Sequence, residues 1–199
     1  VYGRPFSVML SRELPPACEA ASSVSAESRG CRVGIDLGGS DRKAAAVIDG
    51  KTVYTEEVLW QPKSACELRY HYAHITAALR SAAEHLPRVD AVGFSTAGVV
   101  MDGEIRRSGL FMNVPAAEFD RCGRDILQRA ARDVFGAVPC TVCNDGDVAA
   151  LAGSIALGRQ ELLGIAMGTS QAGGYVDENG HITGRLNELA FLPVDVSAQ

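Results

Sequence analysis

Two carboxylates, Asp145 and Asp147, lie at the start of the segment NDGDVAALAG, whose small residues read as the opening of a helix. A helix start has backbone N–H groups without intrahelical partners, and an Asn or Asp side chain there commonly accepts one of them. A carboxylate at such a place can also act as a general base, because it can take a proton from a hydroxyl within hydrogen-bond reach. Capping is the commoner role, so chemistry at Asp145 depends on what the rest of the chain brings to it.

A third carboxylate precedes a glycine turn. The stretch GIDLGGSDRKAA has Asp36 near the end of an apolar strand, followed by Gly38, Gly39 and Ser40. Consecutive glycines allow a tight turn whose bare N–H groups can hold a phosphate, and the Ser40 hydroxyl can add a contact. Asp36 can hold Mg²⁺ directly or through water. An ordinary hairpin turn also explains the glycines, but an ionised group in an apolar strand is costly without a partner.

The stretch MGTSQAGG contains a second turn of this kind, with Gly168 and Thr169 after an apolar strand. Two such turns, each opening a strand hairpin, suit a nucleotide whose phosphates are held between two lobes. The sequence therefore indicates a cleft in which a phosphate-bearing ligand meets the carboxylate of Asp145.

Hydrophobic periodicity predicts the elements that position these residues. Three strand-like runs joined by Gly-containing turns come first. Apolar residues three and four apart then predict helices over 68–86 and 119–134, with a Gly-rich loop before the second. Strands are expected over 89–96 and 137–142, and the latter leads into the helix of NDGDVAALAG. The order β-β-β-α-β-α-β-α predicts a mixed sheet covered by helices.

The chain then repeats its opening theme: ELLGIAMGT, AGGYVDENG and HITGRL read as strands, with a turn at Asn179-Gly180. We therefore expect a leader of uncertain structure over 1–30, a first domain over 31–159 and the start of a second, incomplete domain over 160–199. On this interpretation the sequence is a fragment of a longer protein.

Bulk composition excludes several classes of protein. The chain has 47% hydrophobic residues and a formal net charge of −5, as ordinary globular proteins do. No basic stripe offers a surface for nucleic acid, and no apolar run approaches the roughly 20 residues that span a bilayer. No secretory signal is evident, so we expect a cytoplasmic protein without nucleic-acid or membrane partners. Cys140 and Cys143 form a CxxC in an apolar, β-branched run, which favours buried strand thiols over a redox pair or zinc site.

Five blocks stand in order along the chain: VGIDLGGSDRKAAAV, GFSTAGVVMDGEI, CNDGDVAALAG, MGTSQAGGYVDENGHI and NELAFLPVD. Their order and spacing resemble the ROK family of sugar kinases and sugar-responsive repressors, in the actin/hexokinase/Hsp70 ATPase superfamily, over about residues 31 to 195. The resemblance implies an α/β, ribonuclease H-like (actin-like ATPase) fold, with a mixed sheet flanked by helices followed by the first strands of a second, similar domain. It also implies an ATP-dependent sugar kinase that uses Mg²⁺.

The resemblance assigns a role to each site residue. Asp145 matches the family's general base, which accepts the proton of the attacking sugar hydroxyl, while Asn144 can take the capping role. Asp36 matches a Mg²⁺ ligand, directly or through water. The positions that match the two phosphate loops for ATP are Asp36, Gly38, Gly39, Ser40, Gly168 and Thr169. The positions that match hydrogen-bonding partners of sugar hydroxyls are Asn113, Asn144 and Glu188.

Departures from the family pattern leave the function open. Phe191 stands where many members have a histidine that contacts the sugar and ligates a structural zinc, so zinc is not predicted within this chain. The second turn has Ser170, Gln171 and Ala172 in place of glycines. The first alternative to a kinase is a sugar sensor or repressor without turnover, and the second is an ATPase with a non-sugar acceptor. The sequence does not decide whether the protein forms a homodimer. Because the family's adenine pocket is mostly built from later residues, we expect this piece alone to have little or no kinase activity.

Overall fold

The computed structural model describes residues 10, 13, 29–168, 170–182, 184 and 187–189. The strands are β1 (Cys31–Leu37), β2 (Asp41–Ile48), β3 (Lys51–Leu59), β4 (Ala91–Thr96), β5 (Val99–Met101), β6 (Glu104–Arg107), β7 (Cys140–Asn144), β8 (Leu162–Met167), β9 (Gln171–Val176) and β10 (Asn187–Glu188). The helices are α1 (Leu68–Ala83), α2 (Ala116–Cys122), α3 (Ile126–Phe135) and α4 (Asp145–Leu157), with short 3-10 turns η1 (Pro62–Ser64) and η2 (Gly109–Phe111). Among the described residues, no helix has the length and hydropathy needed to cross a membrane.

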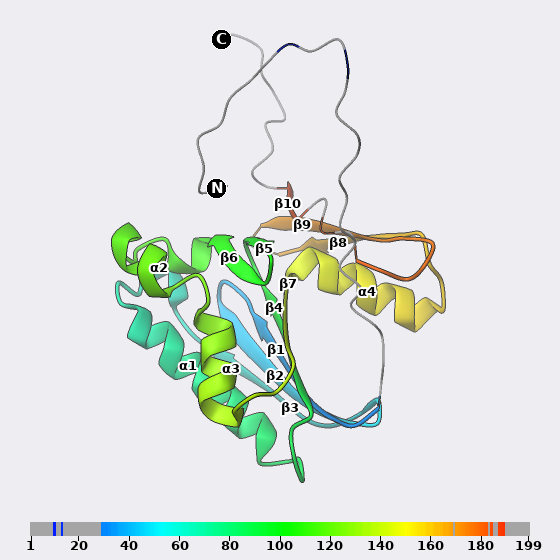
Figure 1. Ribbon diagram of the computed structural model, residues 1–199, viewed down its shortest axis with the longest axis horizontal. Coiled ribbons are helices and arrows are strands. Elements are labelled where there is room, and N and C mark those ends of the chain that lie inside the picture. Colours follow the sequence, from blue (N-terminus) through cyan, green and yellow to red (C-terminus); the bar gives the residue numbers. More distant parts are fainter. Residues whose placement is uncertain are drawn as a thin grey trace.

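A mixed five-stranded sheet forms the first half of the structure (Figure 1). Its strand order is β3-β2-β1-β4-β7, in which β1, β2 and β3 are antiparallel neighbours while β4 runs parallel to both β1 and β7. Helices α1 and α3 pack together on one face, and alternate residues of β1, including Val33, Ile35 and Leu37, are buried in the core. The fold is thus the predicted mixed sheet flanked by helices.

The parallel strands bring three chain segments to one edge of this sheet. Asp36 of β1 pairs in register with Ser95 of β4, and Thr96 pairs with Asn144 at the end of β7. Parallel strands place their carboxyl ends together, where ligands of open α/β sheets commonly bind. Residues far apart in the sequence therefore meet where the candidate site lies.

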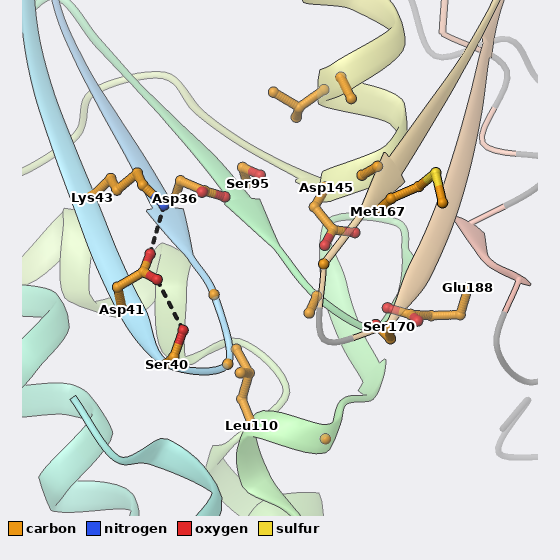
Figure 2. A pocket seen from close by; sticks show the side chains of 18 of the residues that line it. Asp36, Ser40, Asp41, Lys43, Ser95, Leu110, Asp145, Met167, Ser170 and Glu188 are labelled. Carbon is orange, nitrogen blue, oxygen red and sulfur yellow. Dashed lines mark hydrogen bonds and ion pairs between the residues drawn. The ribbon is translucent and has the colours of Figure 1, made fainter. Parts of the chain in front are cut away.

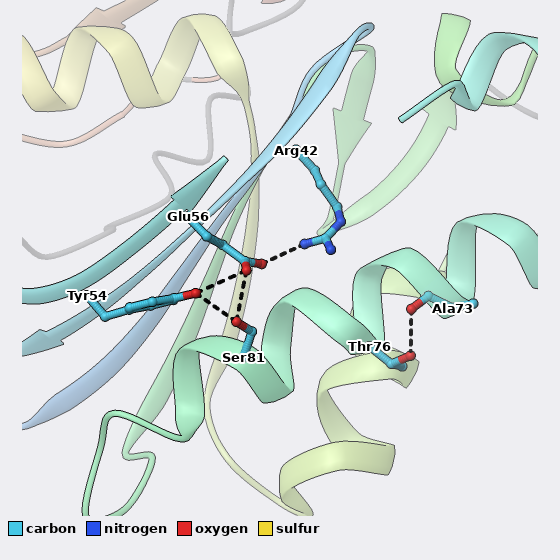
Figure 3. A network of polar contacts seen from close by, with 6 residues as sticks. All are labelled: Arg42, Tyr54, Glu56, Ala73, Thr76 and Ser81. Carbon is cyan, nitrogen blue, oxygen red and sulfur yellow. Dashed lines mark hydrogen bonds and ion pairs between the residues drawn. The ribbon is translucent and has the colours of Figure 1, made fainter. Parts of the chain in front are cut away.

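A partly buried ion pair fixes α1 against the β2–β3 hairpin (Figure 3). The guanidinium of Arg42 donates to Glu56 at 2.8 Å, and the same carboxylate accepts hydrogen bonds from the hydroxyls of Tyr54 and Ser81 at 3.1 and 2.9 Å. Burial raises the pKa of Glu56, but these hydrogen bonds outweigh it and hold that pKa below its usual value. Ser81 belongs to α1, so this charged network ties the helix to the sheet.

Helix α4 packs on the second sheet, whose strand order is β10-β9-β8. Glycines make this contact close: a Cβ at Gly164 would lie 2.4 Å from the Cα of Ala150, and one at Gly174 would lie 2.4 Å from the Cα of Asp147. The small residues of α4 therefore match glycines on β8 and β9. The expected division of the chain at residues 159 and 160 stays a prediction, although α4 packs with the strands that follow it.

The segment between β4 and β7 differs from its prediction in two ways. The single helix expected over 119–134 is two helices, because the chain turns at Gly123, where a Cβ would lie 2.4 Å from the ring of Phe119. The Gly-rich loop before it contains the hairpin β5–β6, which turns at Asp102 and Gly103 with φ of 55° and 74°. Asp-Gly with positive φ is a hairpin turn signal, and it was available in the sequence.

Two smaller expectations have different outcomes. Cys140 and Cys143 lie in β7 as predicted, and burial raises the pKa of both thiols to about 11, so they are unreactive at neutral pH. Only Ile182 of the expected strand HITGRL is seen in a β-bridge, with Val176, and much of the remainder lies outside the described residues.

Candidate active site

A cleft of about 580 Å³ lies between the carboxyl end of the first sheet and the N-terminal half of α4 (Figure 2). One wall is the glycine turn after β1, and the other is formed by α4 and the strands β8 and β10. The residues predicted from the sequence that line this cleft are Asp36, Gly38, Gly39, Ser40, Asp145, Gly168 and Glu188. Both predicted turns and the predicted base therefore face one cavity.

The first glycine turn is closed by its own polar contacts. The N–H of Gly38 donates to the carbonyl of Asp41 at 3.0 Å, and the Ser40 hydroxyl donates to the Asp41 carboxylate at 2.9 Å. The same carboxylate accepts from the Lys43 ammonium at 2.6 Å. The N–H groups of Gly39 and Ser40 make no hydrogen bond within the described part of the chain. These two donors are therefore available to an anion such as phosphate.

Asn144 and Asp145 have separate roles at the start of α4. Asn144 is fully buried: its Oδ1 accepts the N–H of Gly146 at 2.8 Å, and its Nδ2 donates to the carbonyl of Gly98 at 2.8 Å. Asn144 is therefore the N-cap, and both polar atoms of its amide have protein partners. Asp145 also accepts from the N–H of Gly146, at 3.0 Å, but its side chain lines the cleft. Figure 2 shows its carboxylate across the cavity from Asp36.

The two aspartates of this helix turn have perturbed acidities. Burial and the charges of Glu188 and Asp36 raise the pKa of Asp145 to about 6, against the opposing hydrogen bond from Gly146. Burial and the charge of Asp145 raise the pKa of Asp147 to about 6 as well. Asp147 does not line the cleft; it is only 4% exposed, and its Oδ1 has no partner among the described residues. Of these two aspartates, Asp145 is therefore the one placed to exchange a proton with a ligand in the cleft.

Glu188 reaches the cleft from β10, which joins the two walls through Gly98. Its Oε1 accepts a hydrogen bond from the N–H of Gly98, whose carbonyl is the acceptor of Asn144. Gly98 has φ of +121°, and a Cβ there would lie 2.4 Å from the carbonyl oxygen of Arg107, so only glycine fits. The N–H and the carbonyl of Gly98 thus connect Glu188 to Asn144, the N-cap of α4.

One predicted site residue, Asn113, does not line the cleft of Asp145. Asn113 lines an adjoining cleft of about 750 Å³, which shares Gly39, Ser40 and Lys63 with the first. Its Nδ2 donates to the carbonyl of Lys63 at 2.7 Å, so the structure does not bring Asn113 to Asp145. Thr169 and Phe191 lie outside the described residues.

Several residues of the cleft had no predicted role. Lys43, Lys63 and Ser95 line it. Lys43 and Ser95 are the register partners of Asp36 on β2 and β4. Counting outward from the Gly-Gly turn would have paired Lys43 with Asp36, because a hairpin fixes its register. The sequence carries no comparable signal for Lys63.

The sequence assigns no role to His71 of α1, but the structure places this residue against the wall of the cleft. The side chain is fully buried, and its Nε2 lies 2.8 Å from the carbonyl oxygen of Leu110, which lines the cleft. A polar group can sit in a core when it has a hydrogen-bond partner, and this partner belongs to a distant segment that periodicity cannot reveal.

No protein-family model and no curated protein sequence matches the chain. Solved structures do match it, at low identity. A ROK hexokinase from Thermus thermophilus has a TM-score of 0.52 and 20% identity, covering 79% of this chain and 48% of its own. The chain has the fold of ROK sugar kinases. The resemblance seen in the sequence is thereby confirmed at the level of the fold.

Two further matches share this fold. An inorganic polyphosphate/ATP-glucomannokinase from Arthrobacter sp. strain KM has a TM-score of 0.61 and 20% identity, covering 84% of this chain and 65% of its own. A ROK-family transcriptional regulator, a homologue of the E. coli MLC protein, has a TM-score of 0.63 and 16% identity, covering 85% and 43%. The chain therefore spans between 43% and 65% of the length of these proteins. The fold thus occurs in kinases and in a regulator.

The donor set of the cleft suits Mg²⁺ only in combination with a ligand. Among the described residues, no cluster of three or more His, Cys, Asp or Glu side chains could hold a metal ion by itself. Mg²⁺ is usually held by one or two carboxylates together with waters and substrate phosphates. Asp36, beside the glycine turn, fits the part of such a carboxylate.

Proposed function

We propose that the full-length protein transfers the γ-phosphoryl group of ATP to a hydroxyl of a sugar, with Asp145 as the general base. The single observation that carries this proposal is the position of Asp145, which faces the glycine turn and its two free N–H donors across one cleft. The shared fold with sugar kinases supports the same conclusion.

The glycine turn would bind the phosphates of ATP. Phosphoryl transfer depends on positioning and on neutralising charge, and the N–H groups of Gly39 and Ser40 supply fixed donors for that purpose. Lys43 and Lys63 add positive charge to a cleft that also contains Asp36, Asp145 and Glu188. Asp36 would hold Mg²⁺, directly or through a water, and the bound ion would neutralise the β- and γ-phosphate oxygens. Gly168 and Thr169 of the second turn would complete the phosphate site.

Asp145 would orient and deprotonate the acceptor. As the sugar oxygen forms its bond to the γ-phosphorus, its proton passes to the Asp145 carboxylate, the bond from that phosphorus to the bridging oxygen breaks, and ADP leaves. With a pKa of about 6, Asp145 is mostly ionised at neutral pH yet basic enough to accept the proton. Glu188 and Asn113 are the candidate partners of sugar hydroxyls. Asn144, whose amide is buried and paired, positions Asp145 instead.

The domain division belongs to the same proposal. The two walls of the cleft would be two lobes that close around the substrates, as lobed kinases do to exclude water. Because α4 packs with β8 and β9, the second lobe would begin at α4, before the division expected at residue 160. Closure would also bring Asn113 from the adjoining cleft toward Asp145.

A sugar-sensing regulator without turnover is the second candidate. The observation that favours it is the match to the ROK-family transcriptional regulator, which has a TM-score of 0.63 with this chain. Such a protein would retain the sugar site around Asp145 and Glu188 without transferring phosphate.

A coupled ADP-release assay on the full-length protein separates the two candidates. The panel would contain hexoses, amino sugars and N-acetylated sugars, each also tested for a rise in melting temperature. Turnover that depends on one sugar supports the kinase. A sugar-dependent rise in melting temperature without ADP release from any member of the panel would reject the kinase in favour of the sensor.

A further inference from the structure

We propose that Trp60, which does not line the cleft of Asp145, is a positioning residue that holds the glycine turn in its phosphate-binding shape. The inference rests on the proposed nucleotide site and adds to it the residue that sets the direction of its donors. Trp60 directly follows β3, is 4% exposed and lies behind the turn of Gly38, Gly39 and Ser40.

Two hydrogen bonds join Trp60 to the turn. Its indole Nε1–H donates to the carbonyl of Gly38 at 2.9 Å, and its backbone N–H donates to the carbonyl of Ser40 at 3.1 Å. Both ends of the turn are therefore tied to one residue on the neighbouring strand. The N–H of Gly38 is already used by the carbonyl of Asp41.

The hydrogen bond from the indole of Trp60 to the Gly38 carbonyl determines the direction in which the N–H of Gly39 points. The carbonyl of Gly38 and the N–H of Gly39 belong to one planar trans peptide unit, so they point in opposite directions. An indole that holds this carbonyl on the side of Trp60 turns the N–H of Gly39 to the opposite side. Gly39 lines the cleft of Asp145 and Trp60 does not, while both residues line the adjoining cleft that contains Asn113. The side of Gly39 away from Trp60 is therefore the side of the cleft of Asp145. The donor is thus aimed before any ligand arrives, and prealigned donors are effective because they need no reorganisation.

Trp60 is itself held by α1. Its ring lies 6.4 Å from that of Tyr70, nearly parallel, and 6.0 Å from that of His71, edge to face. The Tyr70 hydroxyl accepts the N–H of Gln61 at 2.9 Å, and His71 contacts the carbonyl of Leu110 in the cleft wall. The same helix face therefore backs both the glycine turn and η2.

Packing alone does not account for this arrangement. A buried indole N–H needs an acceptor, and here the acceptor is the carbonyl of the peptide unit whose N–H, that of Gly39, is one of the two free donors of the turn. Phenylalanine would fill most of the volume of Trp60 but would leave the Gly38 carbonyl without this donor. The functional role and the packing role can therefore be separated by substitution.

The test compares W60F with Y70F in the full-length protein. Tyr70 belongs to the same aromatic cluster and lines the adjoining cleft with Gly39, but the hydrogen bond that its substitution removes joins it to Gln61 and not to the glycine turn. Calorimetry would measure the affinity of each variant for Mg²⁺ with adenylyl imidodiphosphate, and for adenosine, which has no phosphates. We expect W60F to bind the triphosphate analogue about tenfold more weakly, as loss of one hydrogen bond would cause, and adenosine as tightly as the wild type does. Y70F should change neither affinity.

Each contrary result has its own meaning. Equal weakening of both ligands by W60F, or unchanged binding of the triphosphate analogue, would overturn the positioning role. Failure of the wild type to bind the analogue would instead overturn the proposed nucleotide site. Should W60F not fold, the emission of Trp60 decides, measured in the full-length protein after any tryptophan outside these 199 residues has been replaced by phenylalanine, since these residues contain no other tryptophan. Saturating analogue must then change its emission, and unchanged emission contradicts the inference.

Discussion

Three residues at the start of α4 have similar side chains but different roles. Asn144 caps the helix, Asp145 faces the cleft, and Asp147 is buried with an unpartnered oxygen. The sequence left open whether Asp145 caps the helix or does chemistry. The structure shows that the amide of Asn144 caps the helix, so the carboxylate of Asp145 can face a ligand in the cleft. Both aspartates have raised pKa values, which makes the protonation of this turn measurable.

Asp147→Asn should stabilise the protein at neutral pH. Burial raises the pKa of Asp147 from 3.8 to about 6, so its charged form is penalised in the folded state above that pH. We expect a gain of about 3 kcal/mol in the free energy of unfolding at pH 7.5, since the pKa rises by about two units and each unit corresponds to about 1.4 kcal/mol. The gain should vanish as the pH falls through 6 toward 3.8, because the wild-type group is then protonated in both states. Urea unfolding at two pH values measures this, and a gain independent of pH would contradict the account.

The pH dependence of turnover should report Asp145. Its pKa of about 6 predicts that kcat/KM of the full-length kinase falls below pH 6, about tenfold per pH unit, as the base becomes protonated. Initial rates of ADP release, measured with excess coupling enzymes, would show this limb. A profile that stays flat to about pH 5 would contradict the assignment of Asp145 as base.

Helix α4 is positioned by close contact with β8 and β9, and this contact aims Asp145. Small residues alone did not indicate this contact in the sequence, because Ala favours any helix and single glycines are tolerated in helices that have no close partner. The fit is visible only when the helix and the strands are together: an added Cβ at Gly164 would collide with the backbone of Ala150.

Gly164→Ala should therefore destabilise the protein. Its Cβ would lie 2.4 Å from the Cα and 2.5 Å from the nitrogen of Ala150, so α4 must shift away from β8. We expect a loss of about 1–3 kcal/mol in the free energy of unfolding, as overpacking typically costs.

Gly93→Ala is the matched control for this substitution, since nothing lies within 4 Å of a Cβ at that strand position. Chemical unfolding of both variants makes the comparison. Equal stability of G164A and G93A would show that α4 does not pack as described.

At the scale of the whole molecule, the candidate site lies between the five-stranded sheet and the second sheet with its helix α4. Local patterns predicted most strands, the long helix α1 and the two glycine turns, because periodicity and turn chemistry are properties of short segments. They did not place Asn113 or His71, nor find Lys63, because those positions depend on contacts between distant segments. The break at Gly123 was missed for a different reason: apolar spacing continues across it, although the contact that marks the turn, with Phe119, is local.

The most direct test of the account compares Asp145→Asn with Asp147→Asn in a single turnover of the full-length protein. Labelled phosphate transferred from ATP to the sugar would be measured in both variants, with calorimetry to show that each still binds that sugar. We predict that D145N loses about 10³-fold in the rate of transfer, as removal of a general base typically does, while D147N stays within about tenfold of the wild type. Equal losses in the two variants, or transfer by D145N at nearly the wild-type rate, would contradict the claim that Asp145 is the base of a sugar kinase.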